Sequence, residues 1–340
     1  MTAPAPAGPT PATSLVTGAT GLLGSHLTSL LVERGERPRA LVRPGEPLPW
    51  REGEVEVCRG DLRDRSSLER ALVGVDQVFH CAARTGPTGP PAEYLATNVW
   101  GLQTLLEVAV LAQVRRVVHV SSVTVHGNDV GGSANEDSPL RREPNPYSRS
   151  KLAGERVVAT LVRERAAPVT VVRPGWIYGP GDVASFARFA SLIQRRRMVM
   201  FGAGHNHLPL IYVGDAAQGL LLAAESKEAA GRIYLLVNDE PVTQREFLSA
   251  IAAELGVPPP RRRLPYRLTL MVGAAAEAAG RLTGRVPPLT RYGVQMLGGE
   301  NRFLVGRARQ ELGFSPQVGV QEGVRRSVEW FVGRPESVVG

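Results

Sequence analysis

A phenol and an amine stand four residues apart at Tyr147 and Lys151, which places them one turn apart on the same face of a helix. A cation near a phenol stabilises the phenolate, so we expect Lys151 to lower the pKa of Tyr147 toward the range of a general acid or base. Ser121 and Ser122 follow a predicted strand, where ligands of open α/β sheets bind. The Ser122 hydroxyl is therefore a candidate donor to a substrate carbonyl or alkoxide.

A glycine-rich loop near the start of the chain has the spacing of a phosphate-binding turn. A predicted strand runs into the sequence TGATGLLG at residues 17–24, and a predicted helix follows. Gly18 permits a tight turn, Gly21 lets the backbone approach a pyrophosphate, and Gly24 allows close packing of helix on strand. The helix N-terminus would offer unpaired amides to the anion. Rather than an ordinary glycine-rich turn, we expect a dinucleotide site formed by Gly18, Thr20, Gly21, Leu22 and Leu23.

The residue that ends the second predicted strand indicates which dinucleotide binds. An acidic residue there would hold the ribose hydroxyls of NAD, whereas an arginine accepts the 2′-phosphate of NADP. The chain has Arg43, so we expect NADP, with NAD possible; the alternative is an ordinary surface arginine. Asp61, followed by Leu62, comes after the third predicted strand and is placed to accept a hydrogen bond from the adenine amine. A helix-capping role is the alternative for Asp61.

Short apolar runs alternate with amphipathic stretches along the first half of the chain. The predicted strands are residues 14–17, 39–42, 55–58, 77–81, 116–121 and 169–173, and the predicted helices are residues 22–34, 66–73, 98–112 and 147–165. Strands that alternate with helices form a parallel sheet covered on both faces. The sequence therefore predicts an α/β fold with a Rossmann-type doubly wound parallel sheet.

The chain divides into three predicted parts. Residues 1–13, mostly Ala, Pro, Gly and Thr, are expected to be a disordered tail, and residues 14–174 a dinucleotide-binding domain. Residues 175–340 would be mainly a substrate-binding region, from which segments around 207–237 return to the sheet. Thr243 followed by Glu246 predicts a capped helix over residues 243–255. Residues 268–282 are apolar but interrupted by Glu277 and Arg281, so we expect a core-packing helix, a lid or a membrane-surface contact, not a membrane span.

Motifs at residues 17–24, 61–62, 80–83, 98–101, 121–127, 147–151 and 173–180 together resemble the extended short-chain dehydrogenase/reductase superfamily, over about residues 14–332. The resemblance implies a catalytic trio of Ser122, Tyr147 and Lys151, with Ser122 preferred to Ser121 because it lies five residues before Gly127. It also implies that Lys151 holds the nicotinamide ribose. The cofactor cleft would be lined or supported by Ala82, Ala83 and Asn98, with Pro174 and Ile177 near the nicotinamide.

The second half of the chain indicates a branch of this superfamily. Many sugar-nucleotide epimerases and dehydratases carry an arginine that pairs with the diphosphate where this chain has Leu208. Leucine cannot replace that bidentate contact, although the arginines at 195–197 are an alternative source. The later segments resemble the 3β-hydroxysteroid dehydrogenase-like branch, which acts on apolar alcohols and ketones. His126 stands where many members have tyrosine, and we expect it to be a packed core residue.

Composition excludes several other classes of protein. No apolar run of about 18 residues and no secretory leader are visible, so we expect a cytoplasmic protein without an integral membrane segment. Cys58 and Cys81 are too few for a disulfide scaffold or a metal cluster. The net charge of +8 comes mainly from arginines, which are scattered except for triplets at 195–197 and 261–263. Aromatic residues are not interleaved with these triplets, so nucleic acid is not expected as a partner.

Together these features predict an NADP-dependent oxidoreductase that interconverts a secondary alcohol and a ketone on a hydrophobic small molecule. Tyr147 would exchange the proton and Ser122 would stabilise the developing negative charge. The alternatives are a nucleotide-sugar epimerase or dehydratase with tightly bound NAD and, more remotely, a non-catalytic NADP-binding sensor. The resemblance also implies a homodimer that pairs through the helices at residues 98–112 and 147–165.

Overall fold

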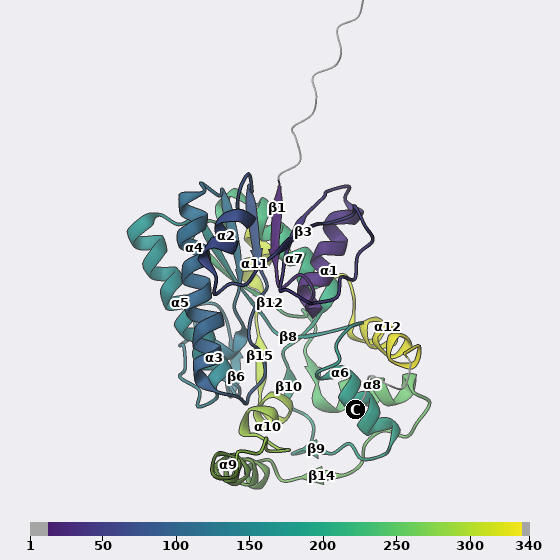
Figure 1. Ribbon diagram of the computed structural model, residues 1–340. Coiled ribbons are helices and arrows are strands. Elements are labelled where there is room, and N and C mark those ends of the chain that lie inside the picture. The colour runs from purple at the N-terminus through teal and green to yellow at the C-terminus, as the bar shows by residue number, and fades with distance from the viewer. Residues whose placement is uncertain (1–12, 335–340) are drawn as a thin grey trace, which may run out of the picture.

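The computed structural model describes residues 13–334, and within them a seven-stranded parallel sheet forms the centre of the molecule (Figure 1). The strand order is β12-β7-β5-β4-β1-β2-β3, and each neighbouring pair is parallel. The strands are β1 (Ser14–Thr17), β2 (Arg39–Val42), β3 (Glu56–Arg59), β4 (Gln77–His80), β5 (Arg116–Val120), β7 (Val169–Pro174) and β12 (Ile233–Leu236). The predicted Rossmann-type α/β fold is confirmed, and the ends of the six strands predicted with bounds each differ by at most one residue from the prediction; β12 was predicted only as part of a segment around 207–237.

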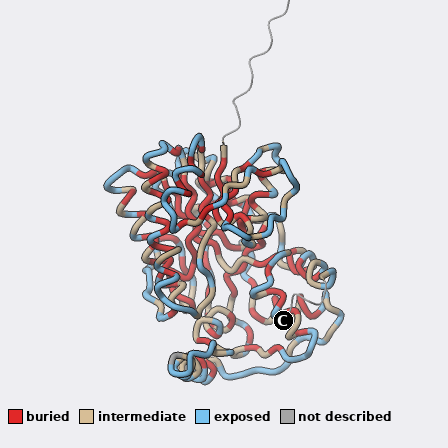
Figure 2. Tube along the Cα trace, viewed as in Figure 1, coloured by how far each residue is buried: buried red, intermediate tan, exposed pale blue. Residues whose placement is uncertain are grey.

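Helices cover both faces of this sheet. On one face α1 (Leu22–Glu33) packs against α7 (Val213–Glu225), and their apolar residues share a buried cluster with β1 and β5. The other face is covered by α2 (Arg65–Ala71), α4 (Leu102–Leu111) and α5 (Pro146–Arg165). The central strands β1, β4, β5 and β7 are almost wholly buried between these layers, which explains their largely apolar sequences, whereas the edge strand β3 is partly exposed (Figure 2).

One predicted helix has a different beginning in the structure. The helix expected over residues 98–112 is preceded by α3 (Pro91–Leu95) and begins as a π-helical turn, Ala96–Gly101, before α4 follows. Gly101 belongs to this turn and lies tight against Leu62, since a Cβ atom on it would be 3.0 Å from the Leu62 Cβ. π-helical turns occur often at functional sites, and Asn98 lies in this one.

The rest of the chain forms short paired strands and the remaining helices. The pairs join β8 (Trp176–Tyr178) with β11 (Leu210–Tyr212), β10 (His207–Leu208) with β13 (Val242–Thr243), β9 (Met200–Phe201) with β14 (Arg263–Leu264), and β6 (Gly132–Ala134) with β15 (Asn301–Phe303). The helices are α6 (Phe186–Gln194), α8 (Gln244–Glu254), α9 (Tyr266–Thr283), α10 (Arg291–Gly298), α11 (Gly306–Leu312) and α12 (Val320–Val332). The predicted capping box of α8 is present, with reciprocal hydrogen bonds between Thr243 and Glu246.

The structure bears on the predicted tail and on the predicted return of the second half of the chain to the sheet. Residues 1–12 of the expected tail lie outside the described residues, but Thr13 is part of the fold because its carbonyl accepts a hydrogen bond of 2.9 Å from the Asp76 amide. β12 pairs with β7, so a segment from the second half does lie in the main sheet. The division at residue 174 stays a prediction. No helix in the described range 13–334 is long and apolar enough to cross a membrane.

Candidate active site

Helix α5 carries Tyr147 and Lys151, and its first turn is fixed by local sequence. The Asn145 side chain caps it by accepting a hydrogen bond of 2.8 Å from the Ser148 amide, and Pro146 occupies the first helical position. Tyr147 therefore stands in the first turn and Lys151 one turn later on the same face, as predicted.

Lys151 is buried below the carboxyl end of β5. Its Nζ donates a hydrogen bond of 2.7 Å to the carbonyl of Val120, the last residue of that strand. Burial lowers the pKa of Lys151 to about 8, with the Cys81 and Glu155 side chains opposing the shift. An ammonium has three donors, and Val120 is its one acceptor within residues 13–334. Donors therefore remain for the hydroxyls of a bound sugar.

The environment of Tyr147 corrects one expectation. Burial raises the pKa of Tyr147 to about 12, and the group that opposes this shift is the Ser122 hydroxyl. The Lys151 amine lies 6.0 Å from the centroid of the Tyr147 ring and bonds to the Val120 carbonyl instead. The predicted lowering of the Tyr147 pKa by Lys151 is wrong, because desolvation of the buried phenol raises that pKa.

The two serines after β5 have different surroundings. Ser121 donates a hydrogen bond of 2.5 Å to the Glu155 carboxylate and so belongs to the protein interior. Ser122 begins the 3₁₀ turn Val123–His126, where its hydroxyl oxygen accepts bonds from the amide and the hydroxyl of Thr124, at 3.2 and 3.1 Å. Its own proton is free to point toward Tyr147 or a substrate oxygen. The geometry thus favours Ser122 over Ser121.

A buried ionic network lies beside these serines. Arg173, on β7, is 2% exposed and pairs with Glu155 of α5. Arg173 also donates to Nε2 of His126 at 3.0 Å, so that nitrogen is the acceptor and Nδ1 carries the proton, 3.4 Å from the Pro139 carbonyl. Burial and the Arg173 charge lower the pKa of His126. His126 is a neutral, 1% exposed residue of the interior, as expected.

The glycine-rich loop has the close packing that a phosphate-binding turn requires. Gly18 has a φ of +67°, and a Cβ atom on it would lie 2.6 Å from the Ala82 amide nitrogen. A Cβ atom on Gly24 would lie 2.1 Å from the Gly18 carbonyl, so only glycine lets α1 approach β1 this closely. Gly21 is the N-cap of α1, and the first helical bond runs from Ser25 to Gly21.

These contacts leave the amides of Leu22 and Leu23 ahead of the first helical bond, where a helix N-terminus binds an anion. The N-terminal turn also carries no acidic side chain. Donors without charge repulsion suit a pyrophosphate, so the loop fits a dinucleotide.

The other predicted cleft residues support the cofactor-facing edge of the sheet in different ways. Asn98 bridges the loop after β4 and helix α5: its Oδ1 accepts from the Arg84 amide at 2.7 Å, and its Nδ2 donates to Ser150 at 2.8 Å. Ala82 and Ala83 follow β4 beside Gly18. Pro174 is the last residue of β7. Ile177 on β8 pairs with Ile211 on β11. Leu62 is a buried core residue. Asn98 is thus a bridge that positions two elements of the cleft.

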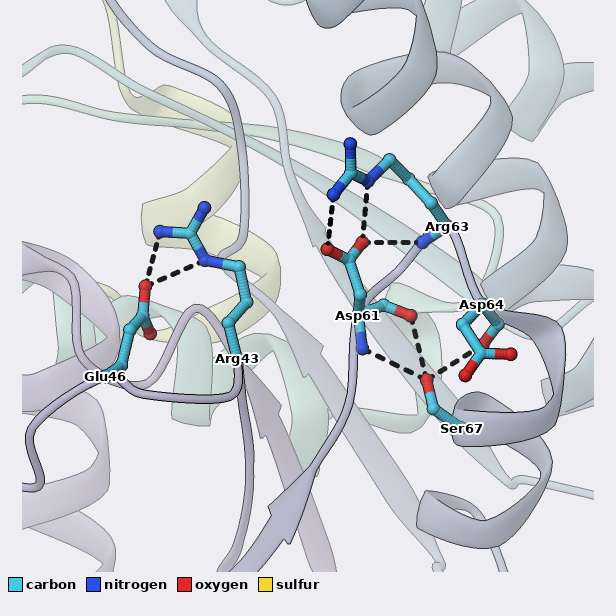
Figure 3. A network of polar contacts seen from close by, with 6 residues as sticks. All are labelled: Arg43, Glu46, Asp61, Arg63, Asp64 and Ser67. Atoms are coloured by element: carbon cyan, nitrogen blue, oxygen red, sulfur yellow. Dashed lines mark hydrogen bonds and ion pairs between the residues drawn. The ribbon is translucent and has the colours of Figure 1, made fainter.

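A turn after β2 brings Glu46 against Arg43 (Figure 3). The Glu46 amide donates to the Arg43 carbonyl at 3.2 Å, and Pro44 and Gly45, whose φ is +81°, occupy the positions typical of a type II turn. The Arg43 Nε donates to Glu46 at 2.8 Å, and the second Glu46 oxygen accepts from the Thr20 hydroxyl at 3.0 Å. One carboxylate therefore connects the glycine-rich loop with the predicted reader of the 2′-phosphate.

Asp61 has its own partner in Figure 3. Its carboxylate receives two hydrogen bonds from the Arg63 guanidinium, at 3.0 and 2.8 Å, and these bonds lower the Asp61 pKa. The helix-capping alternative for Asp61 is wrong, because the N-cap of α2 is Asp64, which accepts from the Ser66 amide. The adenine contact of Asp61 stays a prediction.

Tyr292, on α10, was not identified from the sequence. Its ring meets the Tyr147 ring edge-on, with centroids 6.5 Å apart. No local pattern marks Tyr292, since 145 residues separate it from Tyr147. The Tyr292 ring therefore borders the Tyr147 phenol.

The loop at residues 84–91 is held by Tyr94, whose hydroxyl lies 2.9 and 2.8 Å from the Gly86 and Thr88 carbonyls.

The sequence of this chain is similar to those of known proteins over most of its length. A family model described as the NAD dependent epimerase/dehydratase family matches residues 14–236. The chain belongs to this family. As its motifs predicted, it is an extended short-chain dehydrogenase/reductase with relatives in the 3β-hydroxysteroid dehydrogenase-like branch. This member of the family is an oxidoreductase that uses a nicotinamide cofactor.

Some similar proteins are named as reductases, and another has been solved in complex with a sugar nucleotide. The 2-alkyl-3-oxoalkanoate reductase of Stenotrophomonas maltophilia is 32% identical over 324 residues, 92% of this chain and 97% of that protein. The 3beta-hydroxysteroid-dehydrogenase/decarboxylase isoform 1 of Arabidopsis thaliana is 27% identical over 93% of this chain and 79% of its own length. The structure of MoeE5 in complex with UDP-glucose and NAD has a TM-score of 0.73 and 28% identity, over 94% of this chain and 98% of that one.

Proposed function

We propose that this protein is an NADP-dependent oxidoreductase that interconverts a secondary alcohol and a ketone on a hydrophobic substrate, steroid-like or a long-chain 3-oxo compound. The observation that carries the proposal is the meeting of Ser122, Tyr147 and Lys151 at the carboxyl end of β5. A bound nicotinamide would supply or accept the hydride. The residues of the chain then have to bind the substrate oxygen and move one proton.

In the reducing direction, Ser122 donates a hydrogen bond to the substrate carbonyl and stabilises the negative charge that develops on its oxygen. The Tyr147 hydroxyl transfers its proton to the same oxygen as the alcohol forms. The Tyr147 phenol is protonated at neutral pH, so its proton is present for this transfer. The Lys151 ammonium would then stabilise the phenolate and hold the nicotinamide ribose.

The preference for NADP rests on Arg43, and the fit of the cofactor rests on the loop at Gly18, Gly21 and Gly24. A titration of the protein with NADPH and NADH, followed by fluorescence quenching, tests this part directly. We expect tighter binding of NADPH, and a reversed preference in Arg43→Asp. Tighter binding of NADH by the unaltered protein would favour the epimerase or dehydratase alternative with bound NAD, which MoeE5 illustrates.

An apolar substrate is supported by three observations. Leu208 is 5% exposed and packs in the core, so it offers no phosphate contact. The aromatic ring of Tyr292 borders Tyr147. Two relatives carry the names of enzymes for 2-alkyl-3-oxoalkanoates and 3β-hydroxysteroids. The deciding assay follows NADPH oxidation with 2-alkyl-3-oxoalkanoates and 3-oxosteroids; turnover only with UDP- or dTDP-sugars would overturn the proposal, and turnover with none of them would favour the sensor.

A homodimer through α4 and α5 is a further part of the proposal. Trp100 and Leu111, which begin and end this region of helix, are 58% and 68% exposed. Exposed large apolar side chains along one helical segment suit a symmetric contact. Light scattering after size exclusion should give twice the chain mass of 36.5 kDa, and a monomer at micromolar concentration would refute it.

A further inference from the structure

Helix α9 exposes its large apolar residues to solvent. Leu268 is 55% exposed, Met271 70%, Val272 51% and Leu282 89%. These positions follow one another at helical spacing, and the alanines between them on the same side, Ala275, Ala278 and Ala279, are exposed as well. A helix on the surface of a globular protein normally has the opposite arrangement. The predicted core-packing role of this helix is therefore wrong for its apolar side.

The side of α9 that faces the protein carries Thr269, Gly273 and Glu277 together with the half-buried Tyr266 and Leu270. Thr269 and Gly273 are buried, and a Cβ atom on Gly273 would lie 3.1 Å from the Arg291 amide nitrogen. Glu277 accepts hydrogen bonds of 2.7 and 2.9 Å from the Arg291 amide and Nε. The inward side is thus already occupied by specific contacts, so the helix cannot simply rotate to bury its leucines.

Positive charge surrounds the exposed apolar side. Between residues 255 and 290 the chain has six arginines and one carboxylate, Glu277, which is bonded to Arg291. The triplet at 261–263 and Arg267 are exposed, and none of them has an ion-pair partner within residues 13–334. The segment lies along an edge of the molecule remote from β1, as Figures 1 and 2 show. Apolar and cationic groups therefore share one accessible edge.

We propose that this edge docks on an anionic lipid surface, with the apolar side of α9 entering the headgroup region and the flanking arginines contacting lipid phosphates. A helix with separated apolar and cationic sides is typical of interfacial binding. A second copy of the chain is a poorer partner, because pairing two such edges would bring their arginines together. The lipid surface supplies both the apolar phase and the negative charge that the edge lacks.

The site and this edge are adjacent. α9 packs against α10, the helix whose Tyr292 meets the ring of Tyr147. Under the proposed function, docking would bring the catalytic tyrosine near a membrane-dissolved ketone. This consequence rests on the proposed function, whereas lipid binding itself needs neither cofactor nor substrate.

The test is co-sedimentation of the full chain, without substrate, with vesicles of phosphatidylcholine alone or with about 30% phosphatidylglycerol. We expect binding to the anionic vesicles that weakens as salt rises toward about 0.5 M, since exposed charges are then screened. Met271→Asp should weaken binding about tenfold or more, because a charged carboxylate replaces an apolar side chain that would enter the lipid. Replacing Arg261, Arg262 and Arg263 together by glutamine should weaken it without changing an apolar contact.

Val73→Asp is the matched control, since Val73 is also 70% exposed but follows α2 on the sheet domain. It should leave vesicle binding unchanged, and NADPH titration should show that every variant is folded. Equal binding by Met271→Asp, or none by the unaltered protein, would overturn the proposal. So would self-association without lipid that Met271→Asp abolishes, because a second copy would then cover α9. A protein that binds vesicles but reduces no hydrophobic ketone would retain this inference and lose the proposed function.

Discussion

Arg173 and Glu155 form a doubly hydrogen-bonded ion pair inside the protein, with Nε and Nη2 of the arginine 2.8 and 2.6 Å from the two carboxylate oxygens. The pair ties β7 to α5, and its Oε1 atom also accepts from Ser121. It thus connects the strand, the helix that carries Tyr147 and Lys151, and the segment that carries Ser122. The proposed catalytic residues stand on elements that are held together by charge as well as by apolar packing.

Glu155→Gln should lower the free energy of unfolding by about 3–5 kcal/mol, because it leaves the Arg173 charge buried without a counter-ion. Urea denaturation measures the change. Glu164→Gln is the matched control on the same helix: its ion pair with Arg163 is exposed, so the change should stay within about 1 kcal/mol. Equal losses in both variants would show that the buried pair has no special role.

Lys151→Met should stabilise the protein while it removes activity. The folded-state pKa of Lys151, about 8, lies below its ordinary value of 10.5, so keeping this amine buried and charged costs about 3 kcal/mol below pH 8. The lost bond to Val120 offsets about 1 kcal/mol of the gain. Between pH 8 and 10.5 the unfolded chain binds the proton and the folded chain does not, so the unaltered protein recovers stability.

The difference between Lys151→Met and the unaltered protein should therefore be about 2 kcal/mol at pH 7 and shrink as the pH approaches 10.5. Denaturation at several pH values measures it. Lys227→Met replaces the other lysine, which is exposed, and should change little. A Lys151→Met variant that is less stable at pH 7 would contradict the pKa shift.

Tyr147→Phe should slow turnover about a hundredfold or more while leaving NADPH binding nearly intact, since it removes only the proton donor. Steady-state kinetics with the ketone identified by the substrate assay measures this. Tyr292→Phe keeps the edge-on aromatic contact and should remain within a few-fold of the unaltered rate, about 1 kcal/mol at most. Unchanged turnover in Tyr147→Phe would remove Tyr147 from the mechanism.

Glu46→Gln should tighten NADPH binding about five- to tenfold, because it releases the Arg43 guanidinium and the Thr20 hydroxyl and removes a negative charge near the 2′-phosphate. NADH binding should change much less, so the ratio of the two affinities is the measurement. Glu52→Gln alters an exposed carboxylate after the same turn and serves as the control. Parallel changes for both cofactors would mean that Glu46 does not act on the phosphate.

The strands and helices of the first half of the chain, in their order along the sequence, were predictable from the residues alone. So were the local features within them. The glycines at 18, 21 and 24, the Tyr147–Lys151 spacing and the Thr243–Glu246 cap depend on interactions within a few residues, which local propensity specifies. The continuous apolar strands likewise indicated a sheet buried on both faces. Family membership followed from the same short motifs.

Contacts set by the tertiary fold modify these local features. Burial, which depends on the whole fold, reversed the expected direction of the Tyr147 pKa shift. Contacts between residues far apart in the sequence brought Tyr292 to Tyr147 and Glu155 to Arg173. The outward apolar side of α9 was also invisible, since helical periodicity gives two faces but not which of them the protein covers.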